Sequence, residues 1–555
     1  MHKQEGFSSK IGFILAAAGS AVGLGNIWRF PYLAAQHGGG IFLLTYLILM
    51  LTFGYALLLS ENAIGRMTGK GPIGSYRDLC ASGKKGLRWI GIGGYLNALA
   101  PLIIVPYYCV IGGWVVKYAG AFCTTTVSEF SKDHLVGEAP FAANYFGSFV
   151  TSTWEPLIFF AIFVTITLTV VAFGVEKGVE RSSKLLMPIL IILIVGICIY
   201  CAFLPNAKEG FVYYLKPDFS KFTYMTVVAA MGQLFYSLSL AMGIMITFGS
   251  YMRKEDDLLS SVTQVEIFDT GVAFLAGLMI IPAVVAVGGP QAAEAAGPGL
   301  VFVTMPQVFA SFPGGQFVGI AFFVLVLFAA ATSAISLAET NINTMCQELK
   351  ISRKTSIIWN AVEILGIGTI TVLGYSVLSH IKPLAFLGEK TAGMDILDSL
   401  DYISNSILLP IAAIFTTLLV VAVVGLNTIV RELKGGDRKW PREIVYRICI
   451  RFIVIPALVL ILFAALGIIK EPAKEVPAEE SAVTEEVLKT DASAHKDVEI
   501  PKLKAVEKTA LKDVEIPADK AVEKPVLKDV EIPADKAVEK PALKDVEIPA
   551  ISIKN

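Results

Sequence analysis

Apolar runs of about 20 residues recur along most of the chain, and they constrain its fold more than any other feature. Each run is long enough to cross the hydrocarbon core of a bilayer as a helix. A soluble chain of 555 residues would fold into several domains with polar surfaces, which does not fit a hydrophobic content of 55%. We therefore expect an all-α polytopic membrane protein with about eleven transmembrane helices. The expected spans are 11–35, 40–65, 90–120, 155–174, 183–204, 224–252, 261–288, 317–347, 355–377, 402–428 and 446–469.

The orientation follows from the basic residues in the loops. Lys and Arg cluster at 66–88, 253–254, 350–354 and 431–442, whereas the loop 289–316 contains neither. Because loops facing the cytoplasm carry the excess of Lys and Arg, we expect a cytoplasmic N-terminus. With an odd number of spans, the C-terminal tail would then lie outside the cytoplasm.

The chain divides into three expected regions, which are a cytoplasmic N-terminus (1–10), a membrane domain (11–470) and a low-complexity tail (471–555). In the tail, Lys-Asp-Val-Glu-Ile-Pro recurs with a period of 16 residues, and the net charge is −6 against +5 for the rest of the chain. We expect the tail to be disordered, because it can bury little apolar surface. A folded repeat is the alternative. A nucleic-acid partner is disfavoured, because no basic domain stands apart from the membrane segments.

Two expected spans contain residues that interrupt a helix. The first contains Gly19, Gly23 and Gly25, and the sixth contains the run Tyr236–Gly243. Close helix packing is one explanation for the glycines. If spans 1–5 and 6–10 are inverted repeats, however, the two interruptions correspond, which predicts a binding site at the membrane midplane. Freed carbonyl oxygens there suit a sodium ion, and half-helix N-termini suit a carboxylate.

The segment Ala21–Tyr32 (AVGLGNIWRFPY), together with the three glycines at 38–40, resembles the signature of the neurotransmitter:sodium symporter family. Gly232–Ser239, Ala331–Ser333 and Asp398–Asp401 resemble further motifs of the family, and the likeness covers residues 7–469. It implies a leucine-transporter-type 5+5 inverted repeat with broken helices 1 and 6, in the prokaryotic eleven-helix form. Such proteins are sodium-coupled transporters of hydrophobic amino acids in the prokaryotic cell (inner) membrane.

The resemblance also implies two sodium sites. The first would use the Ala21 carbonyl and the side chains of Asn26, Ser237 and Asp269. The second would use the carbonyls of Gly19, Val22 and Ala329 with the hydroxyls of Thr332 and Ser333.

Asp269 departs from the family pattern, in which this position is usually Asn. Chloride-dependent members need an anion near the first sodium, and the Asp269 carboxylate could supply that negative charge itself. We therefore expect no chloride requirement, with a possible proton cycle at Asp269. The alternative is that Asp269 acts only as a neutral oxygen ligand.

The resemblance places a small-molecule substrate between the two broken helices. Its carboxylate would meet the first sodium, the Gly23 and Gly25 amides and the Tyr108 hydroxyl. Its ammonium would meet the carbonyls of Ala21 and Tyr236, and Ser239. The substrate site would also include Ser237. The expected side-chain pocket comprises Ile104, Tyr108, Tyr236, Met242, Ser333 and Leu337. Because this pocket holds no charged side chain, it favours a neutral, hydrophobic or aromatic L-amino acid. Another zwitterion, such as GABA, glycine or a betaine, is the alternative.

Gates are expected on both sides of this site. Arg29 and Asp401 match the family's outer pair, with Asp398 as the alternative partner. At the inner gate, the family's Arg, Trp and Asp are replaced by Gln4, Phe7 and Gln347. A Gln–Gln contact, or Lys3 with Glu348, could substitute for the missing ion pair.

Three acidic residues in the apolar runs remain. The resemblance implies that Glu61 accepts from amides freed by the sixth-helix break, and the alternative is a buried, protonated Glu61 that bonds locally. We expect only solvated or packing roles for Glu339 and Glu363. The chain contains no nucleophile–base set, phosphate loop or metal-ligand spacing, so we expect no enzymatic activity. A non-transporting membrane sensor is a further alternative.

Overall fold

The structure is a computed structural model. It describes residues 6–469 except 84, 132, 137–138, 296–297, 388–390 and 436–438, and it leaves the side chains of 136, 139, 290–295 and 298 undescribed. The described residues belong to one compact unit, Met1–Pro472. The expectations for the tail, Lys3 and Gln4 lie outside the described residues.

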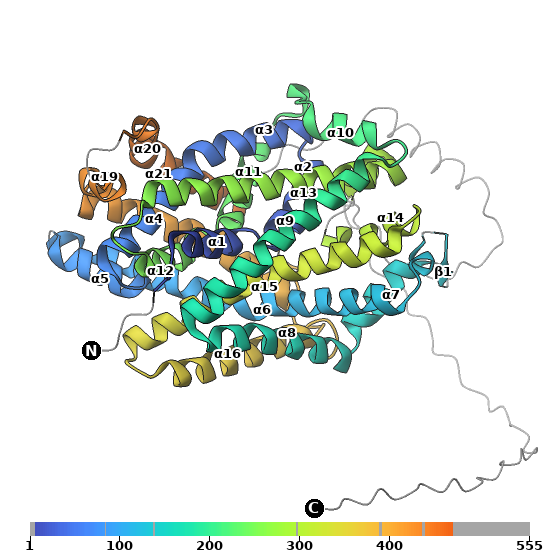
Figure 1. The fold of residues 1–555 in the computed structure, drawn as a ribbon, viewed down its shortest axis with the longest axis horizontal. Helices are drawn as coiled ribbons and strands as arrows, with labels where there is room; N and C mark the ends of the chain where they lie inside the picture. The colour runs from blue at the N-terminus through green and yellow to red at the C-terminus, as the bar shows by residue number, and fades with distance from the viewer. Residues whose placement is uncertain are drawn as a thin grey trace, which may run out of the picture. The chain divides into compact units, whose positions relative to one another are not determined.

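The membrane domain is built almost entirely of helices (Figure 1). The first five spans are formed by α1 (Lys10–Ala21), η1 (Gly25–Arg29) and α2 (Phe30–Gln36); α3 (Gly40–Leu49), η2 (Met50–Gly54) and α4 (Tyr55–Thr68); η3 (Lys85–Gly91) and α6 (Ile92–Thr124); α8 (Trp154–Ala172); and η5 (Val175–Glu180) and α9 (Arg181–Ala202). The other six are formed by α11 (Tyr224–Ser237) and α12 (Ile244–Tyr251); α13 (Leu258–Ala295); α15 (Gly315–Glu348); α16 (Arg353–Leu373); α17 (Ile396–Asp401), η9 (Tyr402–Leu408), α18 (Leu409–Leu418) and η10 (Leu419–Val424); and α20 (Glu443–Ile448), η11 (Cys449–Ile453) and α21 (Val454–Ala465).

Short elements connect these spans. They are α5 (Pro72–Ser82), η4 (Val127–Phe130), α7 (Phe141–Thr151), α10 (Ala207–Leu215), η6 (Phe219–Lys221), η7 (Pro298–Leu300), α14 (Thr304–Ala310), η8 (Ala385–Leu387), α19 (Leu426–Lys434), and the two-residue strands β1 (Leu135–Val136) and β2 (Ala139–Pro140).

The helices agree with the predicted spans. Nine continuous helices in the described part are long and apolar enough to cross a membrane, and α1 with the following η1–α2 makes a tenth span, bent by 47°. The predicted sixth span is the pair α11 and α12, which residues 238–243 separate. The all-α polytopic fold with breaks in spans 1 and 6 is therefore confirmed.

The two breaks differ in backbone conformation. In the first span the helix ends at Ala21, and Val22 is extended, with φ −74° and ψ 101°. In the sixth, Ser239, Ala241 and Gly243 all have positive φ values, of 52°, 59° and 69°. Positive φ is costly for Ser and Ala, so the surrounding contacts must hold this turn.

One of the contacts that hold this turn is made by the Glu61 side chain. Glu61 is fully buried on α4, and the amide of Ala241 donates to its Oε1 at 2.8 Å. Glu61 therefore accepts from an amide that the α11–α12 break frees, which was one of the two sequence-based explanations.

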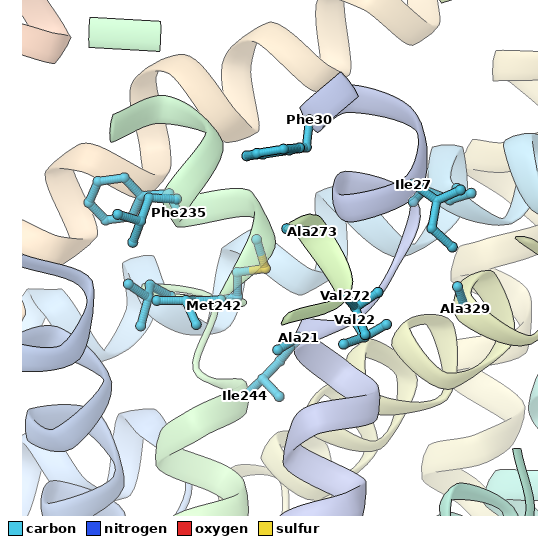
Figure 2. Close-up of a cluster of buried hydrophobic side chains, with 14 of the residues drawn as sticks. Ala21, Val22, Ile27, Phe30, Phe235, Met242, Ile244, Val272, Ala273 and Ala329 are labelled. Carbon is cyan, nitrogen blue, oxygen red and sulfur yellow. The ribbon is translucent and has the colours of Figure 1, made fainter. Parts of the chain in front are cut away.

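Apolar side chains from several helices surround both breaks. Figure 2 shows Ala21 and Val22 at the first break, Met242 in the second, Val272 and Ala273 on α13, and Ala329 on α15. All six are buried. The few polar groups among them are therefore shielded from bulk water.

Candidate binding site at the two helix breaks

A buried polar cluster joins the first break to α11 and α13. Asn26 Nδ2 donates to Asp269 Oδ1 at 2.8 Å and to Ser237 Oγ at 3.0 Å. The Ser237 hydroxyl donates to Asp269 Oδ1 at 2.9 Å. Each of the three residues is 0% exposed. The structure thus brings together the three side chains predicted for the first sodium site.

Two further side chains support this cluster, and the sequence analysis gave neither a role. The hydroxyl of Tyr46, on α3, donates a hydrogen bond to Ser237 Oγ at 3.2 Å. Gln233 on α11 donates to the Gly25 carbonyl at 2.7 Å. Gln233 lies inside a recognised motif, which could have indicated it. No pattern in the sequence distinguishes Tyr46 from other buried tyrosines.

The residues predicted for the second sodium site lie where the first break meets α15. Ser333 Oγ donates to the Ser20 carbonyl at 3.0 Å and lies 3.5 Å from the Val22 carbonyl oxygen. A Cβ on Gly19 would lie 3.3 Å from Thr332 Cβ, so those residues are in contact range. The Thr332 hydroxyl donates to carbonyls of its own helix, including Ala329 at 3.1 Å. The five predicted residues therefore surround one region.

A cavity opens between the two breaks. It is lined by Ser20, Ala21, Gly23, Gly25, Ile104, Tyr108, Tyr236, Ser239, Met242, Ser333 and Leu337. Of the predicted substrate residues, only Ser237 is missing from this lining, because it faces the polar cluster instead. Ser20 is an addition, and its hydroxyl lies 3.3 Å from that of Ser239. The described lining contains no charged side chain.

The cavity is narrow and depends on two glycines. A Cβ on Gly23 would lie 2.4 Å from Ser333 Oγ, and one on Gly25 would lie 2.5 Å from a carbon of the Tyr236 ring. The Tyr108 hydroxyl accepts from the Leu24 amide at 3.2 Å. The volume of the cavity that is open to water is about 20 Å³. A bulky ligand would therefore require the lining side chains to move apart.

The predicted outer gate residues face a second cavity, of about 390 Å³, which Arg29, Tyr236, Asp398 and Asp401 help to line. The Arg29 guanidinium lies 5.5 Å from the centre of the Tyr236 ring. Asp401 Oδ1 accepts from Asn405 Nδ2 at 2.6 Å and from the Tyr107 hydroxyl at 3.2 Å. Among the described residues, Arg29 forms no ion pair with Asp401 or Asp398, and its Nη1 is buried without a hydrogen-bond partner.

At the opposite end, Gln347 and Glu348 have partners other than those suggested. The Gly71 amide donates to Gln347 Oε1 at 2.8 Å. Glu348 pairs with Arg77 at 2.6 Å, and this hydrogen bond raises the pKa of the Arg77 guanidinium. Glu348 is therefore already paired within the described part of the chain.

Glu339 has a structural role that the sequence analysis did not find. It is 0% exposed, and Arg353 donates to both of its carboxylate oxygens, at 2.5 Å and 3.0 Å. Tyr251 also donates to Glu339 Oε1, at 2.8 Å. Of the two roles expected for Glu339, the solvated one is wrong, because the side chain is buried, and the packing one agrees with this geometry. Glu363 accepts from Asn360 at 2.8 Å on the same helix.

These observations define a multi-pass membrane transporter with two broken helices around a buried polar site. The model of the sodium:neurotransmitter symporter family matches residues 4–135 and 150–476, and the chain belongs to this family. It is therefore a sodium-dependent transporter, as the resemblance predicted.

Individual relatives agree with this assignment. The chain is 34% identical to an uncharacterized sodium-dependent transporter of Haemophilus influenzae, over 74% of this chain and 88% of the relative. It is 32% identical to the uncharacterized sodium-dependent transporter YhdH of Bacillus subtilis, over 83% of this chain and 98% of the relative. The crystal structure of MhsT in complex with L-phenylalanine superposes with a TM-score of 0.74 at 36% identity, covering 83% of this chain and 100% of MhsT.

Proposed function

We propose that this transporter imports a neutral, hydrophobic or aromatic L-amino acid together with sodium, by alternating access. The observation that carries the proposal is the cavity between the helix breaks, whose described lining holds no charged side chain. The zwitterionic backbone of an amino acid would find freed amides and carbonyls there, and its apolar side chain would lie against Ile104, Met242 and Leu337. The L-phenylalanine bound to MhsT, which is similar in sequence and fold, supports this substrate class.

We further propose two sodium sites. At the first, the oxygens of Asn26, Ser237 and Asp269 would turn from one another to the ion, joined by the Ala21 carbonyl and the substrate carboxylate. At the second, the Thr332 and Ser333 hydroxyls would act with the carbonyls of Gly19, Val22 and Ala329. Oxygen ligands are those a hard cation prefers. Sodium would supply the electrostatic attraction for the substrate carboxylate, so binding of the two would be coupled.

The gating residues complete the proposed mechanism. Arg29 and Asp401 face one cavity and would pair when the outer side closes over the substrate. In the proposed orientation, the N-terminus (1–10) is cytoplasmic, residues 11–470 form the transport domain in a prokaryotic inner membrane, and the tail (471–555) lies outside the cytoplasm.

Replacing Asn26 with alanine is expected to abolish sodium-dependent substrate binding. The side-chain oxygen would be lost from the first sodium site, and the hydrogen bond from Asn26 Nδ2 to Asp269 would go with it. The measurement is binding of radiolabelled compounds in detergent, screened over the twenty standard amino acids, GABA and glycine betaine, with and without sodium. The Asn427→Ala variant is the matched control and should bind as the wild type does, because Asn427 is an exposed residue of α19.

Two results of that screen would reject the substrate class. One is binding confined to GABA, glycine or a betaine, which would favour the alternative zwitterions. The other is no sodium-dependent binding of any compound in the screen, which would overturn the proposed substrate class.

Transport is expected to be independent of chloride, because the Asp269 carboxylate would supply the negative charge at the proposed first sodium site. Sodium-driven uptake into liposomes should proceed equally in chloride and in gluconate. Stimulation of uptake by chloride would contradict the proposed role of Asp269.

A further inference from the structure

The carboxylate of Glu180 lies against the start of α1. Glu180 is the last residue of η5 and is 1% exposed. The Ser8 amide donates to Glu180 Oε2 at 2.7 Å, and the Ser8 and Ser9 hydroxyls donate to Oε1 at 2.6 Å and 3.1 Å. Ser9 is itself the N-cap of α1 and accepts from the Gly12 amide. The carboxylate thus occupies a helix N-terminus, where free N–H groups and the helix dipole favour an anion.

Two further residues shape this contact. A Cβ on Gly12 would lie 2.0 Å from Glu180 Oε1, so only glycine at this position admits the carboxylate. Lys184, one turn further along α9, donates to Glu180 Oε1 at 2.6 Å and to Ser9 Oγ at 3.2 Å. We call Ser8, Ser9, Glu180 and Lys184 the Glu180 clasp.

The clasp lies at the end of the molecule where the family's usual inner ion pair is missing. The segment before α1 also contacts α12 here, because the Phe7 amide donates to the Tyr251 carbonyl at 3.2 Å. The Phe7 ring packs edge-on against Phe248 and Tyr251, with centroids 5.5 Å and 6.0 Å away. An open cavity of about 680 Å³ lies between 6–8, 173–177 and 250–253, which are the segments joined here. Loss of the clasp would therefore let solvent advance along α1.

We propose that Glu180 is a positioning residue that holds this end of the transporter closed, in place of the missing Arg–Asp pair. Its carboxylate fixes α1 against η5. Gly19 and Ala21 of α1, and Val22 directly after it, have the carbonyls that would bind sodium. Opening the clasp would free α1 to move away from α15, and the carbonyl oxygens of the proposed sodium sites would then move apart. This link to sodium rests on the proposed function, whereas the closing contact does not.

The test is hydrogen–deuterium exchange of the full-length protein in detergent, without substrate. Glu180→Gln removes the charge, and Gly12→Ala displaces the carboxylate while leaving Glu180 itself intact. In both variants the amides of Phe7, Ser8, Gly12 and Phe13, which donate hydrogen bonds here, should exchange roughly tenfold faster. One hydrogen bond to a charged group corresponds to an equilibrium shift of about that size. Alanine is a better helix former than glycine, so Gly12→Ala would slow exchange in α1 if the clasp had no effect.

Glu176→Gln is the matched control, because Glu176 is an exposed acid in the same η5 segment. The amides of the Glu176→Gln variant should exchange as those of the wild type do. The amides of α16 should exchange at the wild-type rate in every variant, which distinguishes local opening from a general loss of structure. The double variant of Gly12→Ala and Glu180→Gln should exchange no faster than either single variant, because both remove the same contact.

The proposal is overturned if Glu180→Gln exchanges no faster than Glu176→Gln in residues 8–13, or if Gly12→Ala slows exchange there. A sodium titration of the same samples separates the two proposals. If sodium does not change amide exchange in α1 of the wild-type protein, the proposed sodium sites are contradicted. The Glu180 clasp is tested separately, by the comparison of Glu180→Gln with Glu176→Gln.

Discussion

Asp269→Asn is expected to lower the apparent affinity for sodium by about 100-fold or more. Asparagine retains the size of Asp269 and one side-chain oxygen, so the main change at the proposed first sodium site is the loss of the negative charge. Removing one member of a buried pair of charges costs about 3–5 kcal/mol, which corresponds to this change in affinity. The measurement is the sodium dependence of amino-acid binding in detergent, at constant ionic strength and without chloride.

The matched control is Asp78→Asn, which removes the same charge from an exposed residue paired with Lys70. It should leave the sodium dependence unchanged, because solvent and salt screen that charge. If Asp269→Asn shifts the sodium affinity no more than Asp78→Asn does, then Asp269 acts only as a neutral oxygen ligand. The account of chloride independence would then fail with it.

The placement of the spans was predictable because the membrane imposes a simple rule on the sequence. Backbone groups in lipid must be satisfied within the chain, so every span appears as one long apolar run. The two breaks were predictable for a related reason, since Gly23, Gly25 and the serines of 236–243 are poor helix formers in otherwise apolar runs. The family motifs then placed ten residues of the cavity lining.

The polar contacts between distant helices were harder to predict. Glu339 and Arg353 are 14 residues apart and separated by a turn, and no periodicity links them. Glu180 and Ser8 are 172 residues apart, and the only hint of their contact is Gly12, which resembles an ordinary small residue in an apolar helix. Such contacts depend on how helices pack, which a single sequence does not encode locally. The distance between Arg29 and Asp401 depends in the same way on how the helices pack around the cavity that both residues line.

Arg353→Ala is expected to destabilise the protein by about 3–5 kcal/mol, because it leaves the Glu339 carboxylate buried without its partner. Glu339 is 0% exposed, whereas Arg353 is 21% exposed, so water can replace little of the lost interaction. The Tyr251 hydroxyl would remain as a donor but carries no charge. The measurement is equilibrium unfolding in mixed micelles of SDS and a mild detergent, followed by circular dichroism.

Arg77→Ala is the matched control, because Arg77 also pairs with a glutamate on α15 but is 55% exposed. Exposed pairs contribute about 0–1 kcal/mol, so this variant should unfold nearly as the wild type does. Adding Glu339→Gln to Arg353→Ala should restore part of the loss, because the buried group then carries no charge and can still accept from Tyr251. Equal unfolding of Arg353→Ala and Arg77→Ala would contradict a stabilising role for the Glu339–Arg353 pair. A double variant no more stable than Arg353→Ala would show instead that the guanidinium matters through packing and not through its charge.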